Sequence, residues 1–378
     1  MIVYIVTFAL SLLGVMIADL WYDDQRRFLA GSALAVIPPI LIAGLRDSTV
    51  GFDVELYVLL VFNDIVSNGH NLIDFINLYS DLEIGYLFLN YVIAQVTDLS
   101  FVLLLCIHIL IIIPLYVTAM KLRMYFPPVL FMFIFYMIFF QETLSIVRQS
   151  IALSLSIFAI TLFWEKKYVY YVVCMFIAFL FHQTAVIALS FPMIYYFIDR
   201  FSIRQNSMVL IGVVLVVALF FLNIDNILIW MIESGYVDMK FLKYTSADDT
   251  FTPVLGAANF VVKIVTIAYF IYVMVLYKPD TILKFFLVVA VLDMLFSLCA
   301  LIVQPLDRIS LYYRLMTCIS IPYIIYHYPI IYSDDETPYA RPIEGLFCVL
   351  LFVFWFYVYM LGNYDDTADY QMSSTLFI

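Results

Sequence analysis

Charged residues are scarce in this chain, and so are glycines. Of 378 residues, 12% are charged and 11 are glycine. A soluble domain carries about 25% charged residues, so this composition excludes an ordinary water-facing surface. The sequence contains no Gly-rich loop of the Walker type, which argues against an ATP-driven pump because such loops hold the nucleotide phosphates.

Cysteine is also rare, and its placement argues against two kinds of site. The five cysteines lie inside apolar runs, at positions 106, 174, 299, 318 and 348. None stands at metal-ligand spacing from another, and they form no disulfide framework. We interpret them as small apolar side chains of the core, and we expect no zinc site.

Apolar sequence takes up most of the chain. Hydrophobic residues make up 66% of it, the mean hydropathy is +1.05 and the net charge is −11. Segments such as 101–119 are apolar on every side, whereas the strands of a membrane β-barrel alternate. A helix satisfies its own backbone hydrogen bonds in lipid, so these runs predict an all-α polytopic membrane protein. We expect the lipid bilayer around it and no nucleic-acid partner.

The number of crossings follows from the length of the apolar windows. A bilayer core of roughly 30 Å takes about 20 helical residues. Such windows predict about twelve transmembrane helices in a single domain over residues 1–378, at 1–19, 28–45, 100–119, 125–142, 147–164, 168–181, 183–198, 207–222, 256–277, 283–303, 309–327 and 343–361. The pair 168–181 and 183–198 is short for two full spans, which predicts a tight hairpin or a broken helix.

The basic residues predict the orientation, because short cytoplasmic connections are enriched in Lys and Arg. They fall in alternate short connections, at 26–27, 121–123, 166–167, 200–204, 278–284 and 341. Placing these inside puts both termini and the loop regions 46–99 and 223–255 on the extracytoplasmic side.

Segment 84–97 tests this orientation because it is almost long enough to cross. One additional crossing would move Lys121 and Arg123 outside. We therefore predict outer re-entrant or interfacial segments within 46–99. The alternative, in which 84–97 and part of 54–66 both cross, preserves the same parity.

The densest polar pattern follows the second predicted helix. It runs from Arg46 through Gly51 and Asp53 to Tyr57, and it joins a guanidinium, carboxylates and a turn-forming glycine. Ionisable groups at membrane depth indicate a functional site by default. The alternative is an ordinary capped loop in which Arg46 extends toward the interface and Asp53 begins a helix.

Arg148 and Gln149 open the window at 147–164. A helix N-terminus is a poor place for a cation, so we predict a bound anion that the guanidinium and the helix N-terminus both stabilise. A phosphate group suits this position. The alternative is an ion pair between Arg148 and Glu142.

His182 lies in the apolar turn that follows 168–181. A histidine in such a place is often a satisfied core residue, and that alternative stays open. It is also the only side chain of the hairpin that can move a proton near neutral pH, which makes it a candidate catalytic residue.

Arg308 and Arg314 lie near the start of the window at 309–327, nearly two turns apart, and we predict that they share a face. The alternative for Arg308 is an ion pair with Asp307, which contributes little if exposed. The four outer arginines and the histidine, with carboxylates near them in the predicted topology, indicate a site for pyrophosphate and for proton transfer, because a guanidinium binds phosphate oxygens in bidentate geometry.

In order and spacing these motifs resemble the Wzy-type polysaccharide repeat-unit polymerases, in particular the EpsG-like branch of exopolysaccharide and O-antigen polymerases. The matching residues are Arg46, Gly51, Phe52, Asp53, Tyr57 and Phe62; Glu83, Ile84, Gly85, Tyr86, Leu89 and Asn90; Arg148, Gln149 and Ala152; the turn from Phe181 to Ala185; and Arg308, Tyr312 and Tyr313. The resemblance covers roughly residues 40–320, and the tail 362–378 lacks the Pro-Tyr pair that we associate with the family.

The resemblance implies a metal-independent glycosyltransferase of the GT-C type in the bacterial inner membrane, with its active site on the extracytoplasmic face and no cofactor. Such enzymes transfer a growing glycan from undecaprenyl pyrophosphate to the non-reducing end of another lipid-linked repeat unit. Undecaprenyl-pyrophosphate-linked oligosaccharides are thus the expected partners, and a chain-length regulator is a candidate protein partner.

The resemblance also implies roles for individual residues. The donor pyrophosphate would lie against Arg46, Arg148, Arg308 and Arg314, whose charge would stabilise the leaving group. The base that deprotonates the acceptor hydroxyl would be His182, Asp53 or Glu83. Gln149, Tyr57 and Tyr313 would contact the substrate.

Three other functions remain as alternatives. An O-antigen-ligase-type transferase would use the same arginine and histidine chemistry. A lipid-linked glycan flippase would need a cation-lined central cavity and two matched halves, and the sequence shows no convincing duplication. A membrane O-acyltransferase would use His182 but would leave the outer arginines without an evident task.

Overall fold

The computed structural model describes residues 1–200, 254–277, 279–301, 306–328 and 341–373. The chain divides into two compact units, the first formed by 1–189 and 318–378 and the second by 190–317. Among the described residues no β-strand forms, and one isolated antiparallel bridge joins Arg46 to Met372. The prediction of a single transmembrane domain is not tested by this division and stays a prediction.

Helices account for nearly all of the regular structure described. In the first unit they are α1 (Ile2–Leu20), α2 (Gln25–Gly44), η1 (Val54–Leu59), α3 (Leu60–Asn68), α4 (Leu72–Leu78), α5 (Ile84–Ala94), α6 (Ser100–Lys121), α7 (Pro128–Ile138), α8 (Phe140–Ser145), α9 (Val147–Trp164), α10 (Tyr168–Phe181), η2 (Gln183–Leu189), α17 (Thr317–His327), α18 (Arg341–Trp355), η5 (Phe356–Leu361) and η6 (Tyr364–Asp366). In the second unit they are α11 (Ser190–Arg200), α14 (Val254–Leu276), α15 (Thr281–Ala300) and α16 (Asp307–Leu315). The elements η1 and η5 are π-helical, and η2 and η6 are 3₁₀-helical.

Seven helices of the described residues are long and apolar enough to cross a membrane. They are Ile2–Leu20, Gln25–Gly44, Ser100–Lys121, Val147–Trp164, Ala258–Leu276, Thr281–Ala300 and Ile343–Leu361. Each coincides with a window predicted from the sequence, which confirms the all-helical membrane class. The total of about twelve crossings and the GT-C-like arrangement stay predictions. Window 207–222 and nearly all of loop region 223–255 lie outside the described residues.

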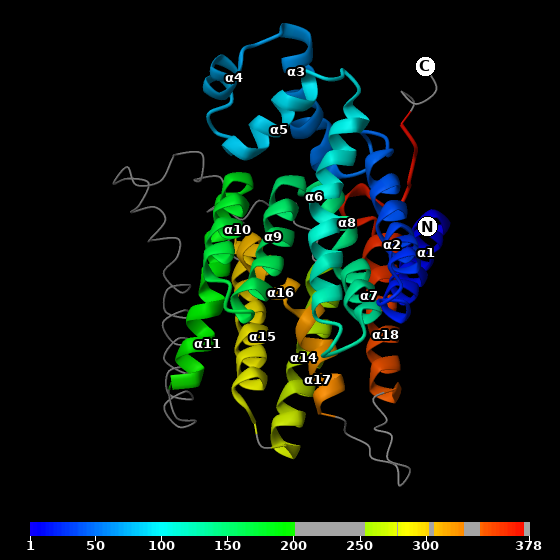
Figure 1. Cartoon of the computed structure of the whole chain (residues 1–378), viewed down its shortest axis with the longest axis vertical. Coiled ribbons are helices and arrows are strands. Elements are labelled where there is room, and N and C mark those ends of the chain that lie inside the picture. The colour runs from blue at the N-terminus through cyan, green and yellow to red at the C-terminus, as the bar shows by residue number, and fades with distance from the viewer. Residues whose placement is uncertain (201–253, 278, 302–305, 329–340, 374–378) are drawn as a thin grey trace. The chain divides into compact units, whose positions relative to one another are not determined.

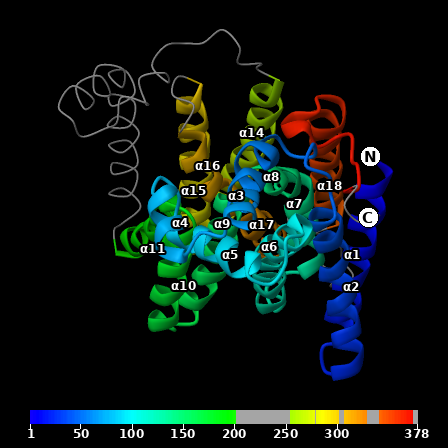
Figure 2. The same cartoon turned by 90° about the horizontal axis from the view of Figure 1, so that it is seen from above.

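The region between α2 and α6 consists of short helices. Figures 1 and 2 show α3, α4 and α5 gathered beyond one end of α9 and α10 and next to the first turns of α6. Helix α5 has 11 residues and is therefore roughly 16 Å long, about half of a bilayer core. That length does not allow α5 by itself to cross, and it agrees with a re-entrant or interfacial segment at 84–97.

Helices α1 and α2 pack with their backbones close together (Figure 1). A Cβ added to Gly14 would lie 2.3 Å from the backbone nitrogen of Ala35, and one added to Gly31 would lie 2.5 Å from that of Ala18. Small residues allow such approach in membrane helix pairs, where packing and hydrogen bonds replace the hydrophobic effect. The hairpin ends at Gly44, directly before the polar motif at Arg46.

Two of the predicted windows are interrupted helices. The window 125–142 is divided at Phe139 into α7 and α8, and 309–327 is divided at Met316 into α16 and α17. A further break at Ile146 separates α8 from α9. Each break exposes backbone N–H and C=O groups that need partners, and the polar side chains described next lie at such helix ends.

Candidate functional site

Arg46 is buried, with 1% of its surface exposed. Its Nε donates to the Val50 carbonyl at 3.1 Å. Its Nη2 donates to the Leu144 carbonyl at 2.7 Å, and its Nη1 donates to the Ala43 carbonyl. Burial lowers the pKa of Arg46 to about 10, so the guanidinium stays charged at neutral pH. The side chain therefore ties the end of α2 and the loop 45–53 to α8, and the alternative of an Arg46 that extends toward the interface is wrong.

The C-terminal segment 362–373 also holds this loop. The N–H of Asp47 donates to the Gln371 carbonyl at 2.9 Å, and the N–H of Ser373 donates to the Leu45 carbonyl at 2.9 Å. Although the C-terminal segment lacks the expected Pro-Tyr pair, these bonds make it one of the elements that hold the loop 45–53 in place.

Gly51 allows the loop 45–53 to lie against the end of α8. Its φ is +101°, and an added Cβ would lie 2.3 Å from the carbonyl oxygen of Leu144. The neighbouring N–H of Phe52 donates to the Ser145 hydroxyl at 3.1 Å. Only glycine combines this backbone conformation with this close approach.

Three helix ends bring together Glu83, Arg148 and His182, which we call the Glu83 cluster. Glu83 directly precedes α5, Arg148 is the second residue of α9, and His182 directly follows α10. Nη1 of Arg148 donates to Oε2 of Glu83, while Nδ1 of His182 lies 3.8 Å from Oε1. Residues separated by up to a hundred positions in the sequence thus meet, as a shared site requires.

Accessibility differs within the Glu83 cluster. The side chains of Glu83 and His182 are 9% and 11% exposed, and that of Arg148 is 27% exposed. A Cβ added to Gly85 would lie 2.7 Å from the Leu180 carbonyl oxygen, so this glycine lets α5 pack directly on the end of α10. The guanidinium of Arg148 is the member of the cluster that is most open to a ligand.

The contacts of His182 indicate which ring nitrogen carries the proton. The backbone N–H of Thr184 donates to Nδ1 at 3.2 Å, and the Thr184 hydroxyl lies 3.0 Å from the same nitrogen. A nitrogen that accepts an N–H bond is unprotonated, so we assign the proton of the neutral ring to Nε2. In this arrangement Nε2–H is a donor.

Tyr86 and Asn90 support the cluster, and sequence reasoning gave neither of them a role. The guanidinium carbon of Arg148 lies 5.7 Å from the centre of the Tyr86 ring, within the range of a cation–π interaction. The Asn90 side chain is buried, and its Nδ2 donates to the Tyr86 carbonyl at 2.9 Å. Both residues lie in the matched motif that begins at Glu83, and their spacing of one helical turn was the available signal.

The alternative of an Arg148–Glu142 ion pair is wrong, because the ion pair of Arg148 is with Glu83. Glu142 is buried, and its Oε1 accepts a hydrogen bond at 3.1 Å from the hydroxyl of Tyr359, which also donates to the Ile138 carbonyl at 2.9 Å. Glu142 therefore contributes to the attachment of η5 to α7 and α8.

The remaining predicted residues of the first unit lie in different surroundings. Asp53 is partly exposed and precedes η1 without a side-chain capping bond. Tyr57, on η1, is 55% exposed, whereas Gln149, on α9, is buried. Their predicted roles in catalysis and substrate binding stay predictions.

Arg308, Tyr313 and Arg314 belong to α16 in the second unit. Arg308 is exposed and Arg314 is 2% exposed, so the prediction that they share a face is wrong. Six residues turn a helix by about 600°, which leaves the two side chains about 120° apart. The Tyr313 ring stacks on Phe296 at 5.5 Å. The side chain of Asp307 accepts a hydrogen bond from the Ser310 hydroxyl at 3.0 Å.

All five cysteines are free thiols. Within the part of the chain that the structure describes, no group of three or more His, Cys, Asp or Glu residues is placed to hold a metal ion.

Comparison with protein-family models gives one result that covers most of the chain. The model of the EpsG family matches residues 32–372, which include the motif from Arg46 to Tyr57, the Glu83 cluster, α16 and nearly all of the C-terminal segment 362–373. The match therefore extends beyond the roughly 40–320 expected from the motifs. Comparisons with curated proteins and with solved structures gave no match.

Proposed function

Because the chain belongs to the EpsG family, which has a general role in polysaccharide polymerisation, we propose that it polymerises lipid-linked oligosaccharide repeat units. In this reaction the glycan leaves undecaprenyl pyrophosphate and joins the non-reducing end of a second lipid-linked unit. The acceptor hydroxyl attacks the anomeric carbon of the donor, the bond from that carbon to the phosphate oxygen breaks, and the lipid pyrophosphate leaves with the bonding electrons. The proposal places the reaction on the extracytoplasmic face of the bacterial inner membrane, without a metal.

The observation that supports the proposal best is the Glu83 cluster. The leaving pyrophosphate gains negative charge as the bond breaks, and a guanidinium that is already oriented lowers the cost of that charge. Arg148 is held by Glu83 and by the Tyr86 ring, and it is the most accessible charged group of the three. Arg148 is therefore the principal pyrophosphate ligand in this proposal.

His182 acts as a hydrogen-bond donor rather than as the base. With Nδ1 accepting from Thr184, the neutral ring presents Nε2–H, which can donate to a phosphate oxygen of the leaving group but cannot accept the proton of the acceptor hydroxyl. That proton goes to a carboxylate, either Glu83 or Asp53. Glu83 already accepts the bond from Arg148, which favours Asp53.

The other predicted ligands enter the proposal in different ways. Arg46, with its donors on three carbonyls, contributes positive charge and the shape of the loop 45–53. Arg308 and Arg314, on α16, are also proposed as pyrophosphate ligands. Gln149, Tyr57 and Tyr313 are proposed substrate contacts.

The test is the lipid-linked glycan ladder of cells that lack this protein, complemented with single variants. Single repeat units without the protein, and long polymer with the wild type, support polymerisation. Unchanged polymer length in its absence contradicts the proposal and points to a ligase, while loss of all extracytoplasmic glycan points to a flippase.

Two variants of His182 separate the donor role from the base role. A Gln side chain can present an N–H near the position of Nε2, whereas Ala cannot. We expect His182→Ala to lower polymer formation by about 100-fold, the usual effect of losing a preorganised donor, and His182→Gln to recover a measurable part of it. Equal loss in both variants, with equal protein levels, would indicate that His182 is the base.

A further inference from the structure

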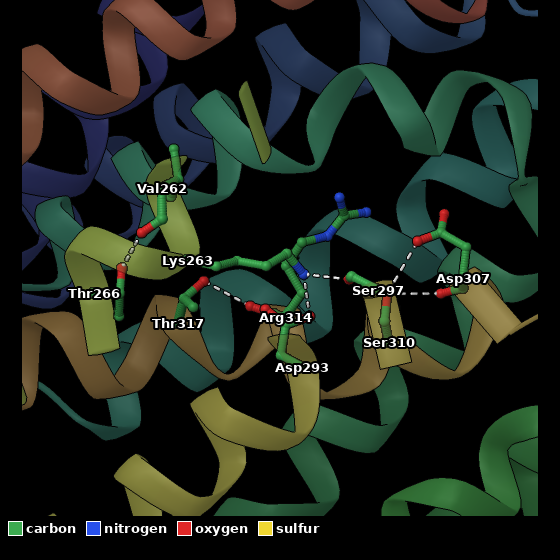
Figure 3. A network of polar contacts seen from close by, with 9 residues as sticks. All are labelled: Val262, Lys263, Thr266, Asp293, Ser297, Asp307, Ser310, Arg314 and Thr317. Atoms are coloured by element: carbon green, nitrogen blue, oxygen red, sulfur yellow. Dashed lines mark hydrogen bonds and ion pairs between the residues drawn. The ribbon is translucent and has the colours of Figure 1, made fainter. Parts of the chain in front are cut away.

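The second unit contains a group of buried charges contributed by α14, α15 and α16. Lys263 on α14 is 4% exposed, Asp293 on α15 is 2% exposed and Arg314 on α16 is 2% exposed. The ammonium of Lys263 donates to Oδ1 of Asp293 and, at 2.7 Å, to the hydroxyl of Ser297 (Figure 3). Arg314 acts electrostatically on both Lys263 and Asp293. We call Lys263, Asp293 and Arg314 the Lys263 cluster.

The three charges lie at similar depth. Lys263 is nine residues from the start of α14, Asp293 is seven from the end of α15 and Arg314 is seven from the start of α16. The connections between α14, α15 and α16 are short, so successive helices run in opposite directions. Counted along each helix, all three charges therefore lie roughly 10–14 Å from the same end of the unit. Figure 3 shows their side chains converging between α14, α15 and α16.

A purely structural role explains this arrangement poorly. Removing both ions of a Lys–Asp pair from water is costly, and well-packed apolar residues of similar volume usually serve stability as well or better. Charged residues inside membrane helices therefore indicate function by default. The signal was visible in the sequence, since Lys263 and Asp293 each interrupt a long apolar run.

The donor hydrogens of the cluster favour an anionic ligand. With the Asp307 carboxylate, which acts on the same charges, cations and carboxylates are equal in number, so the preference comes from the donors. An ammonium has three donor hydrogens, and bonds to described residues use two of those of Lys263. Asp293 is thus a counterion that a stronger anion can replace on Lys263.

We propose that Lys263 and Arg314, with Asp293 as exchangeable counterion, form a second anion-binding site in this protein, whose ligand is a phosphate or pyrophosphate group. This inference deepens the proposed function, because both the donor and the acceptor of that reaction carry a pyrophosphate. The phosphate chemistry is common to a lipid-linked and a free inorganic ligand, and the test separates the two.

The test measures binding to the purified full chain in detergent. One titration uses inorganic pyrophosphate, and a second uses vesicles that contain polyprenyl pyrophosphate. Lys263→Met alone leaves Asp293 buried without its partner and is expected to misfold. The informative variants are therefore the double substitution Lys263→Met/Asp293→Leu and the single substitution Asp293→Asn. Lys284→Met, which removes a lysine near the other end of α15, is the matched control.

We expect the double variant to remain folded and to bind pyrophosphate at least tenfold more weakly, because a lost charge-assisted hydrogen bond has about this effect. Asp293→Asn is expected to bind several-fold more tightly, because it removes the competing anion, and Lys284→Met is expected to bind like the wild type. A response to the vesicles alone identifies a lipid-linked ligand, and a response to both ligands identifies the pyrophosphate group itself. Wild-type affinity in the double variant overturns the inference, as does weaker binding by Asp293→Asn.

The outcomes for this inference and for the polymerase proposal are distinguishable. If the glycan ladder shows polymerisation, but binding of both pyrophosphate probes is absent or does not depend on Lys263, only the second site is wrong. If binding depends on Lys263 while polymer length is independent of the protein, the anion site stands and the polymerase proposal fails.

Discussion

Gly51→Ala tests how the loop 45–53 is positioned. The φ of Gly51 is +101°, and an added Cβ would lie 2.3 Å from the Leu144 carbonyl oxygen, an oxygen that also accepts a bond from Arg46. Real Cβ atoms essentially never approach this closely, so the loop must move away from α8. That movement separates Arg46 from one of its three acceptors.

The size of the effect follows from two contributions. A left-handed backbone costs an alanine about 1–2 kcal/mol, and overpacking against a rigid neighbour costs about 1–3 kcal/mol more. Gly69→Ala is the matched control, because Gly69 has φ +61° and no heavy atom within 4 Å of an added Cβ. The control carries only a backbone cost, and φ +101° lies further outside the left-handed basin than φ +61°. The difference between the variants therefore combines the contact with Leu144 and this additional backbone strain.

Both variants are compared by thermal unfolding in detergent and by the lipid-linked glycan ladder in complemented cells. We expect Gly51→Ala to unfold at a clearly lower temperature than Gly69→Ala and to lose long polymer, while Gly69→Ala retains it. Equal stability and equal polymer length in the two variants would refute the reasoning, because the loop would then not depend on this contact.

Three further predictions concern the first unit. Arg148→Lys should retain less than about a tenth of wild-type polymer at normal protein level in the glycan ladder, because an ammonium keeps the charge but loses the guanidinium fork. Tyr359→Phe should lower the free energy of unfolding by about 1–3 kcal/mol, as measured by denaturation in detergent, because buried Glu142 loses a donor. Truncation after Gly362 should reduce protein abundance on immunoblots, since it removes the bonds of Gln371 and Ser373 to the loop 45–53.

Hydropathy predicted the helices that span in one piece and missed the interruptions. The windows 28–45 and 100–119 correspond to α2 and α6, because a long apolar run in lipid has only the helix to satisfy its backbone. The window 125–142 is equally apolar, yet it breaks at Phe139. An average over 18 residues does not register a break whose released backbone groups are bonded by a distant segment, as Tyr359 does at the Ile138 carbonyl.

The candidate site was also predictable only in part. The residue types at Glu83, Arg148 and His182 were recognisable in the sequence because ionisable groups are rare in apolar runs. Which of them pair was not recognisable, and the sequence interpretation left Glu142 as a possible partner of Arg148. The partner is Glu83, because Gly85 lets α5 reach the end of α10.

Composition and the lengths of the apolar runs are therefore sufficient for the membrane class and for most helix positions, because these depend on the chain's local contact with lipid. The tertiary structure decided which polar groups meet, that Glu83 is the partner of Arg148 and that Asp293 is the counterion of Lys263. These properties depend on distances between helix ends and faces far apart in the chain, and a few ångströms of backbone approach determine them.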